Sequence, residues 1–209
     1  MAQDIETLAR FVANTRFEDI PDAVVAHARR ILLDTLGVIL AGSERPEVRG
    51  LRERLASTAG RGATVFARGW PEHDPRTAGL LNTTAGRAIE LGEGHRYVSY
   101  QGGMQILPGV LAVAEHTQAS GREMLAAFIL GYDAGARIAA AMKPRPLAHQ
   151  NGQAALLGAA AAGARIRGFN AADTSRAMRI ATSLVLTPSY RSEEHTSELQ
   201  SQSTISYAV

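Results

Sequence analysis

Residues 82–108 form a polar, glycine-rich stretch in which carboxylate, imidazole, guanidinium and amide groups stand close together along the chain. Apolar segments flank its polar centre, at 78–88 and 104–115. A carboxylate and an imidazole that share a pocket can divide the roles of general acid and general base near neutral pH. We therefore expect an active site here, although an exposed polar helix end would have a similar composition. The side chains concerned are Glu90, Glu93, His95, Arg96, Tyr97, Tyr100 and Gln101.

Two acids and one distant histidine extend this hypothesis. Glu90 and Glu93 are three residues apart, so they share one helix face if the preceding helix continues through both. His149 lies in a connection that follows Pro144 and Pro146, and from there its imidazole can converge on the same pocket. A helix-capping or buried structural imidazole is the alternative for His149.

The composition excludes several kinds of site. No His–Glu spacing matches a zinc-binding pattern, and the chain has no cysteine for disulfides, thiol catalysis or thiolate ligands. The 22 basic residues are scattered and Lys143 is the only lysine, so there is no nucleic-acid footprint. No apolar run approaches the roughly 20 residues that span a bilayer, and the N-terminus does not resemble a signal peptide. We expect a cytoplasmic protein with no metal site and no membrane or nucleic-acid partner.

The elements that must position these groups are helices. Apolar residues recur at helical spacing along most of the chain, and Gly and Pro residues separate the periodic segments. We predict an all-α, bundle-like domain with at most one or two short strands. Residues 63–67 are expected to form a small strand or an extended packing segment. The helices are expected at 4–14, 22–42, 46–58, 76–91, 105–118, 122–142, 153–167 and 171–185.

Four further expectations concern single positions. Gly102 with Gly103 should break the connection before the helix at 105–118, and Gly131 with Gly135 should allow two helices to approach closely. Asp34 is expected to be an exposed or capping acid, and His73, in a polar turn, is expected to face solvent.

The last residues differ in character from the rest. RSEEHTSELQS, from Arg191, resembles the in-frame translation of a widely used sequencing adapter. ISYAV, at 205–209, resembles the next fixed part of that adapter, with 202–204 as the barcode between them. We predict a domain at 1–190, cut off near Tyr190, and a non-native tail at 191–209 that carries no functional residues. A genuine disordered polar tail is the alternative.

Four separated segments together resemble the N-terminal helical part of the MmgE/PrpD family. They are LARFVANTRFEDIPDAVVAHARRILLDTLGVILAGS, LLNTTAGRAIELGEGHRYVSYQGGMQILPGVLAVAE, GREMLAAFILGYDAGARI and HQNGQAALLGAAAAGARIRG. That family includes 2-methylcitrate dehydratases, cis-aconitate decarboxylases and an epimerase. The resemblance implies a lyase acting on small polycarboxylates with no metal or organic cofactor, a homodimeric intact protein, and a smaller α+β domain after the helical one.

The resemblance also implies roles for individual residues. Glu90 falls at a family acid thought to lie in the active site, and Glu93 falls within what is usually a pair of aspartates, the other position being Gly92 here. His149 matches an active-site histidine of the family. We expect these three side chains, Glu90, Glu93 and His149, to take part in proton transfer.

Three further residues are expected to hold substrate carboxylates. His95 and Arg96 match a frequent His-Arg pair of one branch of the family. Gln101 stands where the family usually has an active-site histidine followed by proline, and here Gly102 follows. A glutamine can hydrogen-bond a carboxylate but cannot carry a proton, so any acid–base role at position 101 would be lost.

The family's catalytic Lys and Tyr and its α+β domain come later in the chain than Tyr190. We therefore expect the 209-residue chain to be inactive by itself. The competing hypothesis is a non-catalytic helical interaction module. It predicts that Glu90, His95 and His149 are widely separated and face solvent, whereas the enzyme hypothesis predicts that His95 and His149 line one concavity.

Overall fold

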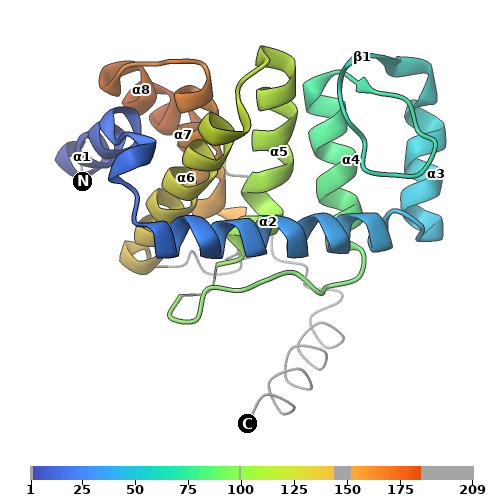
Figure 1. Ribbon diagram of the computed structural model, residues 1–209, viewed down its shortest axis with the longest axis horizontal. Coiled ribbons are helices and arrows are strands. Elements are labelled where there is room, and N and C mark those ends of the chain that lie inside the picture. Colours follow the sequence, from blue (N-terminus) through green and yellow to red (C-terminus); the bar gives the residue numbers. More distant parts are fainter. Residues whose placement is uncertain (1, 99, 144–151, 185–209) are drawn as a thin grey trace, which may run out of the picture.

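The computed structural model describes residues 2–98, 100–143 and 152–184 of the chain (Figure 1). Within these ranges it contains eight α-helices, two short 3-10 helices and one short strand, so the all-α prediction is confirmed. The helices are α1 (Ala2–Asn14), α2 (Asp22–Gly42), α3 (Pro46–Leu55), α4 (Pro75–Arg87), α5 (Gly102–Thr117), α6 (Gly121–Ala141), α7 (Ala154–Ile166) and α8 (Ala171–Ser183). The shorter elements are η1 (Phe17–Asp19), η2 (Ala56–Thr58) and β1 (Ala59–Ala63).

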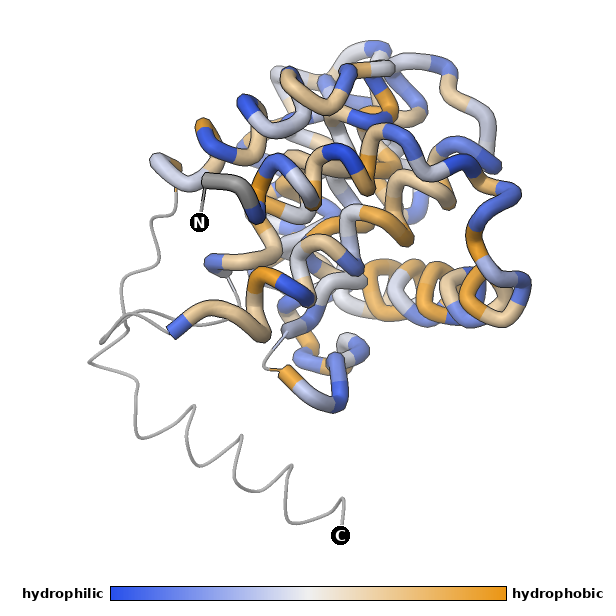
Figure 2. The backbone as a smooth tube through the Cα atoms, turned by 90° about the vertical axis from the view of Figure 1, so that its left-hand side faces the viewer, coloured by the Kyte–Doolittle hydropathy of each residue, from blue (hydrophilic) through white to orange (hydrophobic). Residues whose placement is uncertain are grey.

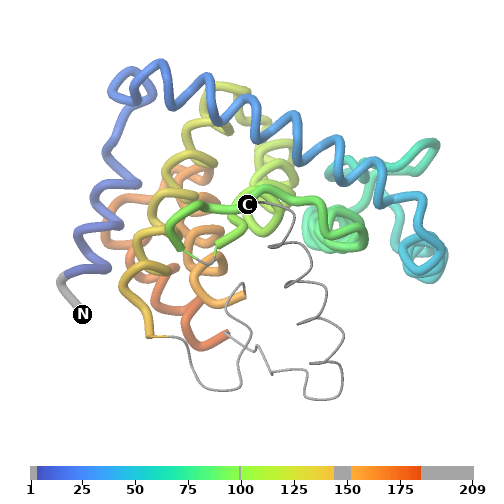
Figure 3. Tube along the Cα trace, turned by 90° about the horizontal axis from the view of Figure 1, so that it is seen from below, coloured from blue at the N-terminus to red at the C-terminus, as the bar shows by residue number. Residues whose placement is uncertain are grey.

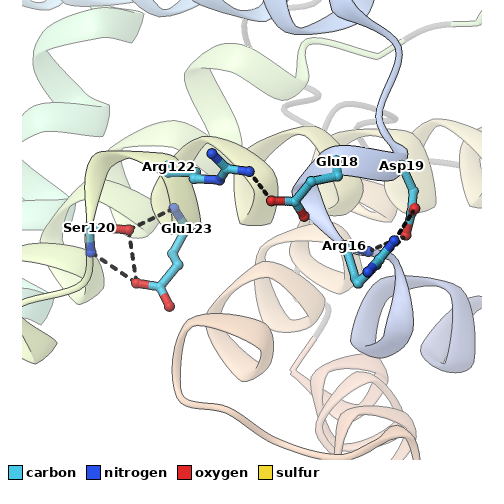
Figure 4. Close-up of polar contacts among 6 residues, drawn as sticks. All are labelled: Arg16, Glu18, Asp19, Ser120, Arg122 and Glu123. Carbon is cyan, nitrogen blue, oxygen red and sulfur yellow. Dashed lines mark hydrogen bonds and ion pairs between the residues drawn. The ribbon is translucent and has the colours of Figure 1, made fainter.

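Local sequence signals account for where several helices begin. Ser120 and Glu123 form a reciprocal capping box at the start of α6, with Ser120 N–H donating to Glu123 Oε2 at 3.0 Å (Figure 4). Asn170 Oδ1 accepts the N–H of Asp173 at the start of α8. Asp74 caps α4 in the same way, and Pro75 follows as the first helical residue.

The long helix α2 lies across the other helices and contacts α4, α5 and α6 (Figure 1, Figure 3). The main core lies between α1, α5, α6, α7 and α8, and hydrophobic and hydrophilic residues alternate along most helices (Figure 2). Helices α6 and α7 approach closely, since a Cβ on Gly131 would lie 2.7 Å from the carbonyl oxygen of Gly158. This confirms the predicted close approach at Gly131. Gly135 instead makes room for the Tyr100 hydroxyl, 2.0 Å from where its Cβ would be.

A polar link joins the turn before α2 to α6. Glu18 in η1 pairs with Arg122, and Arg16 pairs with Asp19 within the same turn (Figure 4). The Arg122 guanidinium also lies 4.5 Å from the centre of the Phe17 ring. The link ties η1, which lies between α1 and α2, to α6.

Helix α6 is the one helix among the described residues that is long and apolar enough to cross a bilayer. More than half of its most apolar window is buried inside the molecule, where α6 packs against α7. A core position therefore accounts for its composition, and the cytoplasmic location stays a prediction.

Some predicted boundaries were wrong. The strand lies at Ala59–Ala63, because this segment forms antiparallel bridges to His73. Of the two alternatives expected for 63–67, the strand is not found at 64–67. Because of the bridges, His73 is fully buried rather than exposed; its Nδ1 lies 3.4 Å from Thr58 Oγ1. Asp34 is exposed, as predicted.

The connection between α4 and α5 also differs from the prediction. Helix α4 ends at Arg87 rather than 91, and Glu90 adopts a left-handed backbone conformation with φ 52°. Helix α5 begins at Gly102, so Gly102 and Gly103 start the helix instead of breaking the connection before it.

Candidate active site

The loop between α4 and α5 carries most of the residues that the sequence singled out. The loop is folded back on itself, since His95 N–H donates to the carbonyl oxygen of Tyr100 at 2.8 Å. In Figure 1 it passes beneath α2, on the same side as the C-terminal end of α6. Its position is set by side-chain contacts to α5 and α6.

Glu93 makes the central contacts of this loop. Its Oε1 accepts the N–H of Gly103 at 2.5 Å, and its Oε2 accepts the hydroxyl of Tyr132 at 2.9 Å. Gly103 is the second residue of α5, where backbone N–H groups have no partner within the helix and the helix dipole favours an anion. Glu93 therefore caps α5 from outside the helix and joins the loop to α6.

A cavity of about 490 Å³ opens between α2, this loop and α6. Its volume is within the range of roughly 300–1,000 Å³ that is typical of small-molecule sites. Helices α2 and α6 contribute mainly apolar side chains to its lining, and the loop contributes mainly polar ones. The lining residues are Val24, His27, Ala28 and Ile31 from α2, Glu93, Gly94, His95 and Arg96 from the loop, and Phe128, Ile129, Tyr132, Asp133 and Ala136 from α6.

The His95 imidazole has a defined partner on one side. The backbone N–H of Tyr97 donates to His95 Nδ1 at 3.3 Å. A nitrogen that accepts a hydrogen bond carries no proton, so this contact assigns the proton of the neutral ring to Nε2. The ring lies near two aromatic neighbours, with centroids 6.1 Å from Tyr97 and 6.4 Å from Tyr132.

Comparison with known proteins identifies the relatives of this chain. The family model of the MmgE/PrpD N-terminal domain matches residues 6–205. The chain belongs to the MmgE/PrpD family. It is also 26% identical over 185 residues to the cis-aconitate decarboxylase-like protein oryM of Aspergillus oryzae, an alignment that covers 83% of this chain and 38% of that relative.

The family membership confirms the resemblance that the separated sequence segments indicated. The MmgE/PrpD match continues past residue 190, while the origin of the segment 191–209 and the predicted domain boundary stay predictions. The chain spans well under two thirds of the length of the relative, so the activity of a whole MmgE/PrpD protein is treated below as a proposal.

The structure divides the predicted site residues of this MmgE/PrpD chain into two groups. Glu93, His95 and Arg96 lie together at the cavity. Glu90 and Gln101 lie outside its lining and share one partner, Arg87, whose guanidinium donates to Glu90 Oε1 at 2.8 Å and to Gln101 Oε1 at 2.6 Å.

Glu90 and Glu93 do not share a helix face, because α4 ends before either residue and the condition for that expectation is not met. His149 lies outside the described residues, so its predicted convergence on the cavity stays a prediction.

Sequence analysis missed three polar residues of the cavity: His27 on α2, and Tyr132 and Asp133 on α6. The available signal was their spacing. His27 is four residues before Ile31, and Tyr132 is four residues after Phe128, so both interrupt apolar helix faces. Nothing local indicated that these two faces would meet at the loop.

Several hydrogen-bond donors line the cavity and suit a ligand with acceptor oxygens. Arg96 and the imidazoles of His27 and His95 can donate hydrogen bonds to a ligand. Glu93 already accepts two hydrogen bonds, from the Gly103 N–H and the Tyr132 hydroxyl. Asp133 is paired with Arg137 at 2.7 Å. Glu93 and Asp133 are therefore both engaged, and Arg96, His95 and His27 are the lining residues that can donate to a ligand.

Two tyrosines at the site hold their protons firmly. Burial, followed by the charge of Glu93, raises the pKa of Tyr132. Burial, followed by the neighbouring Tyr132, raises the pKa of Tyr100, whose hydroxyl has no hydrogen-bond partner in the described part of the chain. Both hydroxyls thus stay protonated at neutral pH, and that of Tyr132 donates to Glu93.

Within the described part of the chain, no three or more His, Asp or Glu side chains are grouped so that they could hold a metal ion. The expected absence of a metal remains a prediction.

Proposed function

We propose that this chain supplies the helical half of an active site that catalyses proton transfer on small polycarboxylates, as part of a lyase. The observation that carries the proposal is the convergence of Glu93, His95 and Arg96 with His27 on one cavity. Family membership supports an enzyme, and the name of the Aspergillus oryzae relative, cis-aconitate decarboxylase-like, supports a polycarboxylate substrate.

The donors of the cavity have the chemistry to hold carboxylates. Arg96 can bind a carboxylate through two parallel hydrogen bonds, and His27 from the facing helix can bind a second one. The Nε2–H of His95 can then donate to a third oxygen of the ligand. A tricarboxylate meets all three donors, whereas a monocarboxylate meets one.

Two reactions fit such a ligand. In dehydration, a base takes a proton from the carbon next to a carboxylate, the leaving hydroxyl is protonated and departs as water, and a carbon–carbon double bond forms. In decarboxylation, carbon dioxide leaves and the carbon that carried it takes a proton. The sequence resemblance favours dehydration of a 2-methylcitrate-like substrate, and the name of the relative favours decarboxylation.

His149 is proposed as a proton-transfer residue of the intact protein, on the family resemblance alone. Replacement of His149 by Ala in the full-length gene product should abolish turnover, and unchanged turnover would exclude this role. Homodimer formation by the intact protein is a second proposal from the resemblance, and light scattering of that protein tests it.

Ligand binding tests the proposed function on the chain itself. The ligand is propane-1,2,3-tricarboxylate, a tricarboxylate without a leaving hydroxyl group, and its neutral triamide is the matched control ligand. Titrations followed by NMR should show binding of the acid but not of the triamide. Arg96→Gln should weaken binding about tenfold, as expected for the loss of a charged hydrogen-bonding partner. Arg54→Gln changes an exposed arginine of α3 outside the cavity and should have no effect.

The helical interaction module is the competing function. It predicts no tricarboxylate binding, or binding that Arg96→Gln leaves unchanged. Either result would contradict the proposed function.

A further inference from the structure

Tyr132 stands between the cavity and the loop that carries the donors. It lies on α6, lines the cavity, and donates its hydroxyl hydrogen to Glu93 Oε2 at 2.9 Å. The other oxygen of Glu93 accepts the Gly103 N–H at 2.5 Å. Glu93 is thus fixed at two points on two different helices, two and three residues before His95 and Arg96.

We propose that Tyr132 is a positioning residue of this site: its hydroxyl fixes the Glu93 carboxylate, and the fixed carboxylate holds the turn that presents His95 and Arg96 to the cavity. The inference rests on the proposed function for its ligand, but the positioning role has a structural readout of its own.

The Tyr132 ring is itself held rigidly, which a positioning residue requires. Its edge-to-face neighbours are Tyr100, with ring centroids 5.2 Å apart, and Phe128, with centroids 5.9 Å apart. Gly102 leaves no spare room beside it, since a Cβ there would lie 2.6 Å from Tyr132 Cδ2. These contacts restrict the ring on the sides away from the cavity and so help to fix the position of its hydroxyl.

The chemistry of the hydroxyl fits a donor rather than a proton source. Burial raises the pKa of Tyr132, so the phenol stays protonated and donates its hydrogen bond at neutral pH. Glu93 in turn has both oxygens occupied, so it acts as a fixed anion, and a role as proton acceptor would break one of its two hydrogen bonds. This leaves the His95 imidazole as the group at the loop that can exchange a proton with a ligand.

Few other described hydrogen bonds hold the part of the loop that carries His95 and Arg96. The described hydrogen bonds of residues 93–97 to the helices are the two of Glu93, and the His95 ring adds an aromatic contact with Tyr132, while His95 N–H and Nδ1 are both engaged within the loop itself. Loss of the Tyr132 hydroxyl removes one of the two anchors. The remaining anchor, the Gly103 N–H, would allow the carboxylate to pivot.

The test compares Tyr132→Phe with Tyr97→Phe, which removes a hydroxyl from an exposed tyrosine of the same loop. The structural readout is the amide proton of Gly103 in NMR spectra of the chain without ligand. Its short hydrogen bond to a carboxylate should place it far downfield. Tyr132→Phe should shift this resonance and broaden or shift the ring signals of His95, and Tyr97→Phe should leave the Gly103 signal in place.

The functional readout is the affinity for propane-1,2,3-tricarboxylate. Tyr132→Phe should weaken binding about tenfold, in line with the loss of a hydrogen bond to a charged group. Glu93→Gln should weaken binding as well, and the double variant should be no weaker than the worse single one, because the two residues act through one contact. Glu93→Gln also keeps the test open if Tyr132→Phe fails to fold.

The outcomes separate the two proposals. An unchanged Gly103 amide signal in Tyr132→Phe, or additive losses of affinity in the double variant, overturns the positioning role. A shifted Gly103 signal in a chain that binds no tricarboxylate supports the positioning role and overturns the proposed ligand.

Discussion

Glu93 and Gly103 are ten residues apart in sequence, and a 2.5 Å hydrogen bond joins the carboxylate of one to the backbone N–H of the other. The bond caps the first turn of α5, which begins at Gly102. Glu93 takes this capping role because the side chain of Gln101, the residue before the helix, makes no capping hydrogen bond. The same bond holds the loop at the cavity. One contact therefore sets both a helix boundary and the position of the candidate site.

A methyl group at Gly103 should disrupt that contact. Its Cβ would lie 2.8 Å from Glu93 Oε1 and 2.9 Å from Thr35 Oγ1, so the carboxylate has to move. We expect Gly103→Ala to lower the free energy of unfolding by about 1–3 kcal/mol and to weaken tricarboxylate binding. Gly109→Ala is the control, since its Cβ meets nothing within 4 Å; it should be neutral or stabilise α5 by up to about 1 kcal/mol. Urea unfolding measures both, and equal stability of the two variants would contradict the prediction.

The contact between α6 and α7 should be equally intolerant of added volume. A Cβ on Gly131 would lie 2.7 Å from both the Gly158 carbonyl oxygen and the Ala162 Cβ. Gly131→Ala should cost about 1–3 kcal/mol of stability through overpacking. Gly163→Ala adds the same methyl group on α7 where nothing lies within 4 Å, and it should not destabilise the chain. The midpoints of denaturant unfolding measure the stability of both variants. A Gly131→Ala variant as stable as Gly163→Ala would show that α6 and α7 can move apart without loss of stability.

Arg165 should stabilise the end of α1. Its Nη1 donates to the carbonyl oxygen of Val12 at 2.5 Å, in the last turn of that helix, and burial lowers the pKa of the guanidinium. Arg165→Met keeps much of the side-chain volume but removes the donor, and should lower the free energy of unfolding by about 1–2 kcal/mol. Arg167→Met, at an exposed position, is the control. Hydrogen exchange at the end of α1 should accelerate only in the first variant; equal exchange in both would argue against this capping role.

The stability that Asp74 contributes should depend on pH. The hydrogen bond of the Thr77 side chain, with smaller contributions from the N–H groups of Thr77 and Arg76, holds the pKa of Asp74 below its usual range. A pKa that is lower in the folded state means that the carboxylate stabilises the fold above the usual Asp pKa, and that this stability is lost as the pH falls through the lower folded value.

Asp74→Ala should therefore melt at a lower temperature than the parent chain at pH 7, and the difference should shrink as the pH falls below about 4. Thermal unfolding followed by circular dichroism at several pH values measures this difference. Asp34→Ala, at an exposed position on α2, is the control. A difference for Asp74→Ala that stays constant down to pH 3 would rule out the carboxylate as its source.

The sequence by itself determined the helices and the family. Helical periodicity and short-range capping depend on residues a few positions apart, as at Ser120 with Glu123, so they can be read along the chain. Four separated segments along the chain indicated the MmgE/PrpD family, which the family match confirms. Glu93, His95 and Arg96 line one cavity, and their roles in an active site stay predictions.

Tertiary structure decided what depends on distant residues. His73 is buried because a strand fourteen to ten positions earlier pairs with it, which no local pattern indicated. His27 and Tyr132 line the candidate cavity because residues of α2, α6 and the loop meet there. Glu90 lies outside the cavity lining and is hydrogen-bonded to Arg87. Local hydrogen bonds and periodicity are encoded over a few residues, whereas the meeting of three elements depends on how the whole core packs.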